Sequence, residues 1–347
     1  MRIPRPVAIL AIGANLASAL TWHSADFSSL VLLENSGIHY SQNGVTTPFE
    51  KILHNNGVNL ARIRIWTSTN NDDYSLTYGL ALAKRAVAAG MSLLIDLHFS
   101  DTWADPGHQA IPSGWPTTLS GLNTQIYDYT LSLVEAFNAQ GTPIALIQLG
   151  NEINDGLLWP VGRISTEGFS PASQLLHSAI SAVRQASPST RTVIHIANGW
   201  DSSDTSYFYG GIFIAGELST SDVDIMGFSF YPFYGTGATY TALQSNLQAM
   251  VTKFGKDVMV METDWPEACS GVALSENIAV GTSGQEQWVS GIRSALEAIS
   301  GGHGIGISYW EPGWIGNAGL GSSCSDNLLV DSTGATRASI SLLSADM

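Results

Sequence analysis

The sequence predicts a single-domain α/β protein, a closed (β/α)8 TIM barrel, and three observations lead to that prediction. Short apolar runs recur along the whole chain, and segments with the spacing of amphipathic helices lie between them. The apolar residues within each run are continuous rather than alternating, which indicates parallel strands buried on both faces. The chain has 347 residues, 44% of them hydrophobic, and no Pro-rich linker or break in composition divides it.

Eight runs are expected to form the barrel strands in chain order. They cover residues 22–26, 60–66, 92–98, 144–149, 192–196, 225–231, 257–262 and 304–310. Apolar residues recur at helical spacing at Leu76, Leu80, Ala83 and Val87, and again at Trp288, Ile292, Ala295 and Ile299, with Gly90 and Gly301 as the expected stops. A doubly wound open sheet is the alternative, but the G-x-G-x-x-G signature that would open its first unit is missing.

The first residues have the pattern of a secretory signal peptide. Arg2 and Arg5 precede an apolar run over residues 7–14, and the small residues Ala17-Ser18-Ala19 follow. A membrane anchor is the alternative, but it needs about 20 apolar residues, and this run stops at Asn15. We therefore expect residues 1–19 to be removed, and residues 20–347 to form a secreted, extracellular catalytic barrel.

Composition narrows the partners of this domain. The net charge of −15 repels phosphate backbones and anionic membranes, so nucleic acid and membrane surfaces are not expected partners. Only 12% of the residues are charged, whereas 10 Trp and 11 Tyr supply the aromatic faces that suit neutral sugars. The eight His show no H-x-x-x-H spacing, so no metal or other cofactor is expected. We expect the protein to act as a monomer.

The ends of the expected strands carry unusually polar residues. Active sites of such barrels lie at the carboxyl ends of the strands. Glu152 follows the fourth strand and Glu262 ends the seventh, which places them across the barrel mouth from each other. Glycoside hydrolysis requires two carboxyl groups, and a separation of about 5 Å allows one of them to act as a nucleophile. A buried ion pair is the alternative explanation for either glutamate taken alone.

Longer motifs around these glutamates resemble one family. Gly150-Asn151-Glu152 and the segment from Glu262 to Pro266 resemble the motifs of a large retaining clan of glycoside hydrolases. Residues 97–106, 156–160, 309–312 and 314–324 are similar to fungal arabinogalactan endo-β-1,4-galactanases of glycoside hydrolase family 53, clan A, and the similarity extends from Leu20 to the end. The resemblance implies retaining endo-hydrolysis of β-1,4-galactan through a covalent glycosyl-enzyme intermediate.

The resemblance also implies a role for individual residues. Glu152 would be the general acid/base and Glu262 the nucleophile, while Asn151 would bind the 2-hydroxyl of the cleaved sugar. His98 and Tyr231 would complete the polar wall, and Trp310 would form the floor beneath the reactive galactose. Further candidates for contacts with the polysaccharide are Asp101, preferred over Asp105, together with Trp103, Trp314, Trp115 and Trp265, each Trp having core packing as its alternative.

Different pKa values are required of the two glutamates, raised for Glu152 and low enough to leave Glu262 ionised. Arg62 is the expected cation beside Glu262, and Arg64, which has the same strand parity, is the second choice.

Four positions depart from the family pattern: the first strand, 22–26, and the residues Asp155, Asn198 and Asp264. Asp155 and Asp264 would each add a negative charge near a catalytic carboxyl group. A mannanase or cellulase of the same clan remains an alternative activity, and a non-catalytic carbohydrate-binding barrel would require the loss of a glutamate, yet both are present.

Cys269 and Cys324 are the only cysteines, and export permits a disulfide between them. Both lie in Gly/Ser-rich stretches after the seventh and eighth strands, where a covalent tie would restrain long loops. Two free buried thiols are the alternative.

Overall fold

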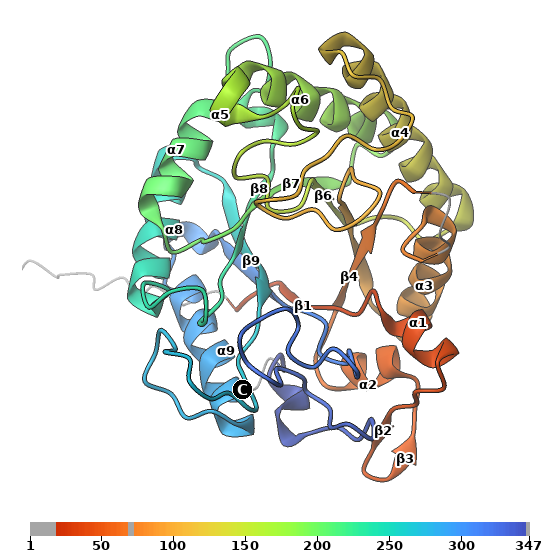
Figure 1. Cartoon of the computed structure of the whole chain (residues 1–347), viewed down its shortest axis with the longest axis vertical. Helices are drawn as coiled ribbons and strands as arrows, with labels where there is room; N and C mark the ends of the chain where they lie inside the picture. The colour runs from red at the N-terminus through yellow and green to blue at the C-terminus, as the bar shows by residue number, and fades with distance from the viewer. Residues whose placement is uncertain (1–18, 69–72, 345–347) are drawn as a thin grey trace, which may run out of the picture.

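The structure, a computed structural model, describes residues 19–68 and 73–344. Eight parallel strands close into one barrel, with helices arranged in a ring around it (Figure 1). In barrel order the strands are β1 (Trp22–Asp26), β4 (Leu60–Ile65), β5 (Ser92–Leu97), β6 (Leu146–Leu149), β7 (Arg191–Ile196), β8 (Ile225–Ser229), β9 (Asp257–Thr263) and β10 (Gly304–Tyr309). The predicted TIM barrel is confirmed, whereas the predicted signal peptide falls, except for its last residue, outside the described residues.

The helices of the outer ring connect successive strands. They are α1 (Leu30–Asn35), α2 (Phe49–Asn55), α3 (Leu76–Ala89), α4 (Leu119–Gln140), α5 (Ile164–Glu167), α6 (Phe169–Ala186), α7 (Ser202–Ile212), α8 (Tyr240–Phe254) and α9 (Thr282–Glu297), with short 3₁₀ turns at Thr220–Asp222, Ser300–Gly302 and Ala338–Ser341. Within residues 19–68 and 73–344, none of these helices has the length and apolarity to cross a bilayer.

The two predicted helices are present, but their details differ. Gly90 ends α3 in the left-handed conformation (φ 105°), as expected of a C-terminal glycine. The buried face of α3 is displaced from the predicted stripe, because Val87 is 38% exposed whereas Leu82 and Ala86 are buried. Helix α9 ends at Glu297, so Ile299 lies beyond the helix and Gly301 belongs to the 3₁₀ turn that follows.

A small hairpin that sequence reasoning did not predict precedes α2. Strands β2 (Ser41–Gln42) and β3 (Val45–Thr46) pair antiparallel through Asn43-Gly44. Both turn residues have positive φ, 52° and 76°, which a two-residue hairpin loop of this kind requires.

The interior of the barrel has an apolar lower layer and a polar upper layer. Side chains two residues apart on a strand face the same side. On each strand, the next inward-facing residue therefore lies two positions closer to the carboxyl end of the barrel. The lower cluster comprises Leu60, Leu94, Leu146, Val193, Ile225, Met259, Met261 and Ile305. Two positions further along, four of these strands carry the buried polar residues Arg62, Asp96, Gln148 and His195. The fold therefore stacks a polar network directly on an apolar plug.

An irregularity in β9 directs Glu262 toward this network. The register against β8 runs Phe228 to Val260 and then Ser229 to Glu262, so β9 contains one extra residue at Met261. A Cβ on Gly227 would come within 2.5 Å of Met261 Cγ, so a glycine at that position leaves room for the displaced side chain. The extra residue places Glu262 opposite Ser229.

The predicted disulfide is present between Cys269, after β9, and Cys324, after β10, which are 55 positions apart in sequence. The segment after β10 lines the main pocket through Leu320 and Gly321, as expected of a loop at this rim. Among the described residues, the contribution of β9 to this pocket is Glu262, which lies within the strand itself, so the disulfide restrains one pocket-lining loop, the one after β10.

Reduction of this disulfide is expected to lower the melting temperature. Closing a loop of this length contributes about 4 kcal/mol in the chain-entropy model, as an upper figure. Differential scanning calorimetry of the oxidised protein, the reduced protein and a Cys269→Ser/Cys324→Ser double variant measures the effect. Three equal melting temperatures would show that the bridge does not stabilise the fold.

Candidate active site

A pocket of about 260 Å³ opens where the strands end. Its walls come from β9 and from the segments that follow β5, β6, β8 and β10, which brings together residues more than 200 positions apart. The lining residues are His98, Trp103, Ala104, Asp105, Asn151, Glu152, Tyr231, Phe233, Tyr234, Glu262, Trp310, Leu320 and Gly321. Both predicted glutamates are among them. A second hollow continues past Glu152 and is lined by Asp105, Pro106, Ala197, Asn198, Ser229, Tyr231 and Tyr234.

Backbone strain concentrates at this rim. Four non-glycine residues that follow barrel strands have positive φ angles: Phe99 (49°), Glu152 (50°), Asn198 (58°) and Glu311 (45°). Such conformations cost free energy for residues with a Cβ and tend to cluster at functional sites. The positions support the assignment of this end of the barrel as the candidate active site.

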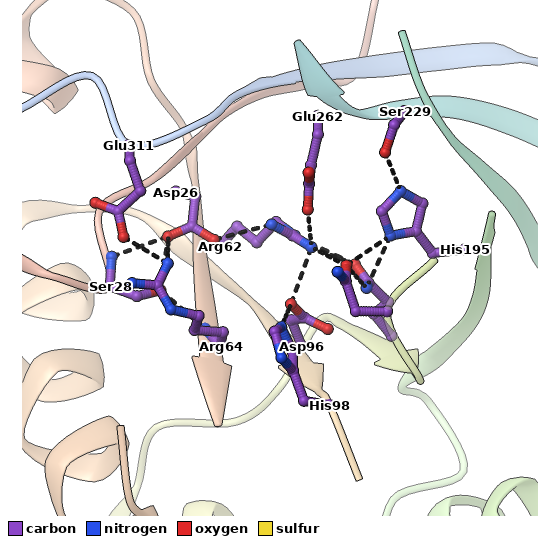
Figure 2. Close-up of polar contacts among 12 residues, drawn as sticks. Asp26, Ser28, Arg62, Arg64, Asp96, His98, His195, Ser229, Glu262 and Glu311 are labelled. Carbon is purple, nitrogen blue, oxygen red and sulfur yellow. Dashed lines mark hydrogen bonds and ion pairs between the residues drawn. The ribbon is translucent and has the colours of Figure 1, made fainter. Parts of the chain in front are cut away.

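Arg62 is the centre of the polar network (Figure 2). Its side chain is 1% exposed and forms ion pairs with Asp26 and Asp96, each at 2.9 Å, and with Glu262 at 2.7 Å. It also donates hydrogen bonds to Gln148 Oε1 (3.1 Å) and Asn151 Oδ1 (2.9 Å). The planar guanidinium suits this role because its five N–H groups can serve several acceptors at once.

Glu262 is buried, 6% exposed, with two stabilising neighbours. Arg62 Nη2 contacts its Oε1, and the hydroxyl of Tyr231 donates to its Oε2 at 2.9 Å. Burial raises the pKa of Glu262 above its usual range, and Arg62 and Tyr231 oppose that increase. The carboxyl group thus has the cation that the sequence predicted, Arg62, and not the second choice, Arg64.

Glu152 has a different environment. Its Oε1 accepts a 2.5 Å hydrogen bond from Ser229 Oγ, and no cation contacts it among the described residues. Burial raises the pKa of Glu152 to about 8, with a further contribution from the negative charge of Glu262. The pair therefore separates into one carboxyl that retains its proton near neutral pH and one that is held beside a cation.

A chain of hydrogen bonds fixes Ser229 behind Glu152. His195 Nε2 lies 2.8 Å from Ser229 Oγ, and His195 Nδ1 lies 3.0 Å from Gln148 Nε2. Burial lowers the pKa of His195 well below its usual value, so the ring is neutral. His195 Nδ1 also lies 2.9 Å from Asn151 Oδ1, so the ring is held by Asn151, Gln148 and Ser229 behind Glu152.

Arg64 belongs to a neighbouring cluster. It pairs with Glu311 at 2.5 Å and lies 3.5 Å from Asp26, while its guanidinium sits over the rings of Tyr74 and Trp103 at 4.2 and 4.3 Å. Figure 2 shows this pair separated from the Glu262 contact, with Asp26 between the two arginines. Arg64 therefore packs against the rings of Tyr74 and Trp103 and does not contact Glu262.

The aromatic wall contains the predicted tryptophans in different roles. Trp310 and Trp103 line the pocket with ring centroids 6.1 Å apart. Trp314 stacks on Trp103 at 5.9 Å and is not among the lining residues, so it supports the wall from outside. Trp265 is fully buried against Trp288, and Trp115 packs on Tyr129, so both follow the core-packing alternative.

The preference for Asp101 over Asp105 is reversed. Asp101 accepts hydrogen bonds from Thr67 Oγ1 (2.8 Å) and the Ser113 N–H (2.7 Å), and it does not line the pocket. Asp105 lines both hollows. The path of the loop after β5 determines which of the two carboxyl groups faces the pocket.

The structure also shows the contacts of His98, Asn151 and Asp155, which the sequence placed near the site. His98 lines the pocket, but its Nε2 lies 3.1 Å from Asp96 and its Nδ1 accepts from the Ala104 N–H at 3.1 Å, so both ring nitrogens have protein partners. Asn151 lines the pocket and donates to Ala104 O at 2.8 Å. Asp155 pairs with Arg163 at 2.8 Å, which directs its charge toward that cation.

Sequence reasoning missed several residues of the site. The missed residues are Asp26, Gln148, His195, Ser229, Phe233 and Tyr234. One signal was present in the sequence: Phe233 and Tyr234 continue the aromatic run that contains Tyr231, immediately after a strand.

The fold and this site define a class of protein, the glycoside hydrolases, because a (β/α)8 barrel here presents two glutamates to one pocket at its carboxyl-terminal rim, one beside Arg62 and the other beside Ser229. Comparison with known proteins identifies the family. The model described as glycosyl hydrolase family 53 matches residues 22–343, and the chain belongs to that family.

Relatives and a solved structure agree with this assignment. Arabinogalactan endo-β-1,4-galactanase A of Emericella nidulans is 45% identical over 324 residues, 91% of each chain. Its counterpart from Aspergillus niger is 43% identical over 335 residues, covering 94% of this chain and 95% of the relative. A solved structure of a fungal β-1,4-galactanase superposes with a TM-score of 0.91 at 40% identity, covering 94% of this chain and 99% of the other.

Proposed function

We propose that this protein is a secreted endo-β-1,4-galactanase that hydrolyses the galactan of arabinogalactan with retention of anomeric configuration. The observation that carries the proposal is the different surroundings of two glutamates in one pocket, Glu262 beside Arg62 and Glu152 beside Ser229. Relatives that are 41 to 45% identical over more than 90% of the chain carry the galactanase name, which supports the substrate.

In the proposed reaction, Glu152 donates its proton to the departing glycosidic oxygen while Glu262 attacks the anomeric carbon. The raised pKa of Glu152, to about 8, keeps it protonated at neutral pH, where this first step requires an acid. The covalent intermediate then reacts with water, and Glu152, now a carboxylate, removes the proton of that water. The proton returns to Glu152 and Glu262 is released as the anion.

The remaining pocket residues position the sugar. Trp310 offers an aromatic face to the apolar face of galactose, and Tyr231 keeps the Glu262 carboxylate oriented through its hydrogen bond. The side-chain N–H of Asn151 that does not bond Ala104 O is our candidate for the hydrogen bond to the 2-hydroxyl of the cleaved sugar. The hollow on the other side of Glu152, with Asp105 and Asn198 in its wall, is the expected place for the leaving-group end of the chain.

Secretion through a cleaved signal peptide over residues 1–19 belongs to the same proposal, as does action by a single chain.

Product analysis tests the substrate and the stereochemistry together. We expect internal cleavage of unbranched β-1,4-galactan and no cleavage of arabinogalactan with a β-1,3 backbone, of mannan or of cellulose. A proton NMR time course should show the β-anomer of the new reducing end first, because two displacements at one carbon restore the configuration. The α-anomer as first product would contradict the nucleophilic role of Glu262, whereas cleavage of mannan instead of galactan would contradict only the substrate.

A further inference from the structure

Asp264 is a buried carboxyl group without a hydrogen-bond partner. It follows β9, two residues after Glu262, and is 1% exposed. Among the described residues, neither of its carboxyl oxygens accepts a hydrogen bond, and neither takes part in an ion pair. An ionised carboxylate in this state would lose its hydration without compensation, which is far more costly than burying a neutral acid.

The charge balance of the upper barrel identifies Asp264 as the group with the least support for a negative charge. Two guanidinium groups, Arg62 and Arg64, share this region with the carboxyl groups of Asp26, Asp96, Glu152, Glu262, Asp264 and Glu311. Because cations are outnumbered, these carboxyls cannot all ionise in a region of low dielectric. The carboxyl groups that remain protonated should be those without a guanidinium group or another hydrogen-bond donor in contact.

The individual contacts rank these carboxyl groups. Asp26, Asp96 and Glu262 each contact Arg62, and Glu311 contacts Arg64. Glu152 has the hydroxyl of Ser229. Among the described residues, Asp264 contacts neither an arginine nor a hydroxyl donor.

The titratable groups that face Asp264 add no positive charge. Burial raises the pKa of Asp264 well above its usual range, and the carboxyl of Glu262 raises it further. The backbone N–H of Trp310 opposes the increase, but its own hydrogen bond goes to Thr263 O at 3.2 Å. The facing groups are Glu262 from β9, Glu311 after β10, Asp26 from β1, and the phenols of Tyr231, Tyr234 and Tyr309.

We propose that Asp264 carries a proton in the working enzyme, so that Glu262, its neighbour beside Arg62, is the carboxyl that bears the negative charge. Two nearby carboxyls that compete for one buried charge separate according to which of them contacts the cation. The catalytic part of this inference rests on the proposed nucleophilic role of Glu262. The protonation of Asp264 does not.

Asp264→Asn tests the proposal, because asparagine has nearly the shape of the neutral acid and cannot ionise. We expect the variant to fold and to keep its kcat/KM on galactan at pH 5 within about threefold of the parent. A residue that works as an anion would instead lose about 100-fold or more on this change. That loss, or failure of the variant to fold, would overturn the proposal.

The pH dependence of stability provides a readout that needs no catalysis. The folded-state pKa of Asp264 lies above its unfolded value of about 3.9, so the folded state holds one more proton between these two values. The parent should therefore lose stability relative to Asp264→Asn as pH rises above about 4, by up to tenfold in the unfolding equilibrium constant per pH unit. This loss should stop once pH exceeds the folded-state pKa.

Asp128→Asn is the matched control, because it is the same substitution made at an exposed aspartate on α4. Urea unfolding from pH 4 to 8 should give parallel curves for the parent and Asp128→Asn, and a diverging curve for Asp264→Asn. Parallel curves for all three would overturn the proposal. A diverging curve with an active Glu262→Ala would leave the proton on Asp264 established and reject the proposed nucleophile instead.

Discussion

Glu262→Ala is expected to abolish hydrolysis of galactan, and azide is expected to restore turnover with an activated aryl galactobioside. Removal of a nucleophile eliminates the covalent route, and losses of about 10⁶ in kcat follow when such machinery is deleted in other hydrolases. The alanine leaves a space beside Arg62, which contacts Glu262 at 2.7 Å and can attract a small anion. Attack by azide is a single displacement, so the product should be an α-galactosyl azide.

Glu152→Ala should behave differently. A general acid contributes about 10² to 10⁴ to the rate, and that contribution matters only when the leaving group needs a proton. Hydrolysis of galactan should therefore fall strongly, whereas formation of the glycosyl-enzyme from an activated aryl galactobioside should be largely spared. Burst kinetics on the aryl substrate, with Glu135→Ala on the outer face of α4 as the control, distinguishes the roles. If Glu152→Ala and Glu262→Ala slow the reaction of the aryl substrate equally, the assignment of the two roles is refuted.

The pH profile provides an additional test of the acid. Because the pKa of Glu152 is raised to about 8, the group is protonated below that value and active as an acid. The kcat/KM for galactan should fall as pH rises through this range. In Glu152→Ala that alkaline decline should be absent from kcat/KM for the activated substrate.

The sequence predicted the fold well, because a parallel strand buried on both faces produces a continuous apolar run that few other structures explain. Three of the predicted strands run past the observed ones at their carboxyl ends to His98, Tyr231 and Trp310, and each of these final residues lines the pocket. A polar residue directly after a buried apolar run therefore indicates both where the strand ends and where the active site lies.

The polar interior could not be predicted from periodicity alone. Gln148 and His195 lie within runs that are otherwise apolar, and nothing local distinguishes an inward residue from an outward one. The register supplies that information: β5, β6 and β7 place Asp96, Gln148 and Val193 in adjacent positions, which fixes the height of each side chain in the barrel. Loop residues are harder still, because the choice between Asp101 and Asp105 depends on the path of the whole segment after β5.

Arg62→Met is expected to destabilise the fold and to inactivate the enzyme together. Removal of one partner from a buried ion pair costs about 3 to 5 kcal/mol because the other charge remains buried without compensation. Here Asp26, Asp96 and Glu262 would all lose their contact with a cation. The loss of Arg62 should also raise the proton affinity of Glu262, which removes the anion that attacks the sugar.

The pH dependence of this cost follows from Asp96. Burial works to raise its pKa, but Arg62 holds the pKa of Asp96 below its usual value. A carboxyl with a lowered folded-state pKa contributes stability above the unfolded value of about 3.9 and loses it as pH falls through the folded value. The difference between the parent and Arg62→Met should therefore be largest near neutral pH and shrink in acid.

Arg85→Met is the control for this experiment. Arg85 also contacts two carboxyls, those of Glu34 and Glu50, but its side chain is 29% exposed and lies outside the barrel. Solvent screens such pairs, and loss of one costs about 1 kcal/mol or less. Urea unfolding and kcat/KM on galactan measure both variants. If Arg62→Met is no less stable than Arg85→Met, or hydrolyses galactan as fast as the parent, Arg62 does not organise this site, and the ionised state of Glu262 needs another source.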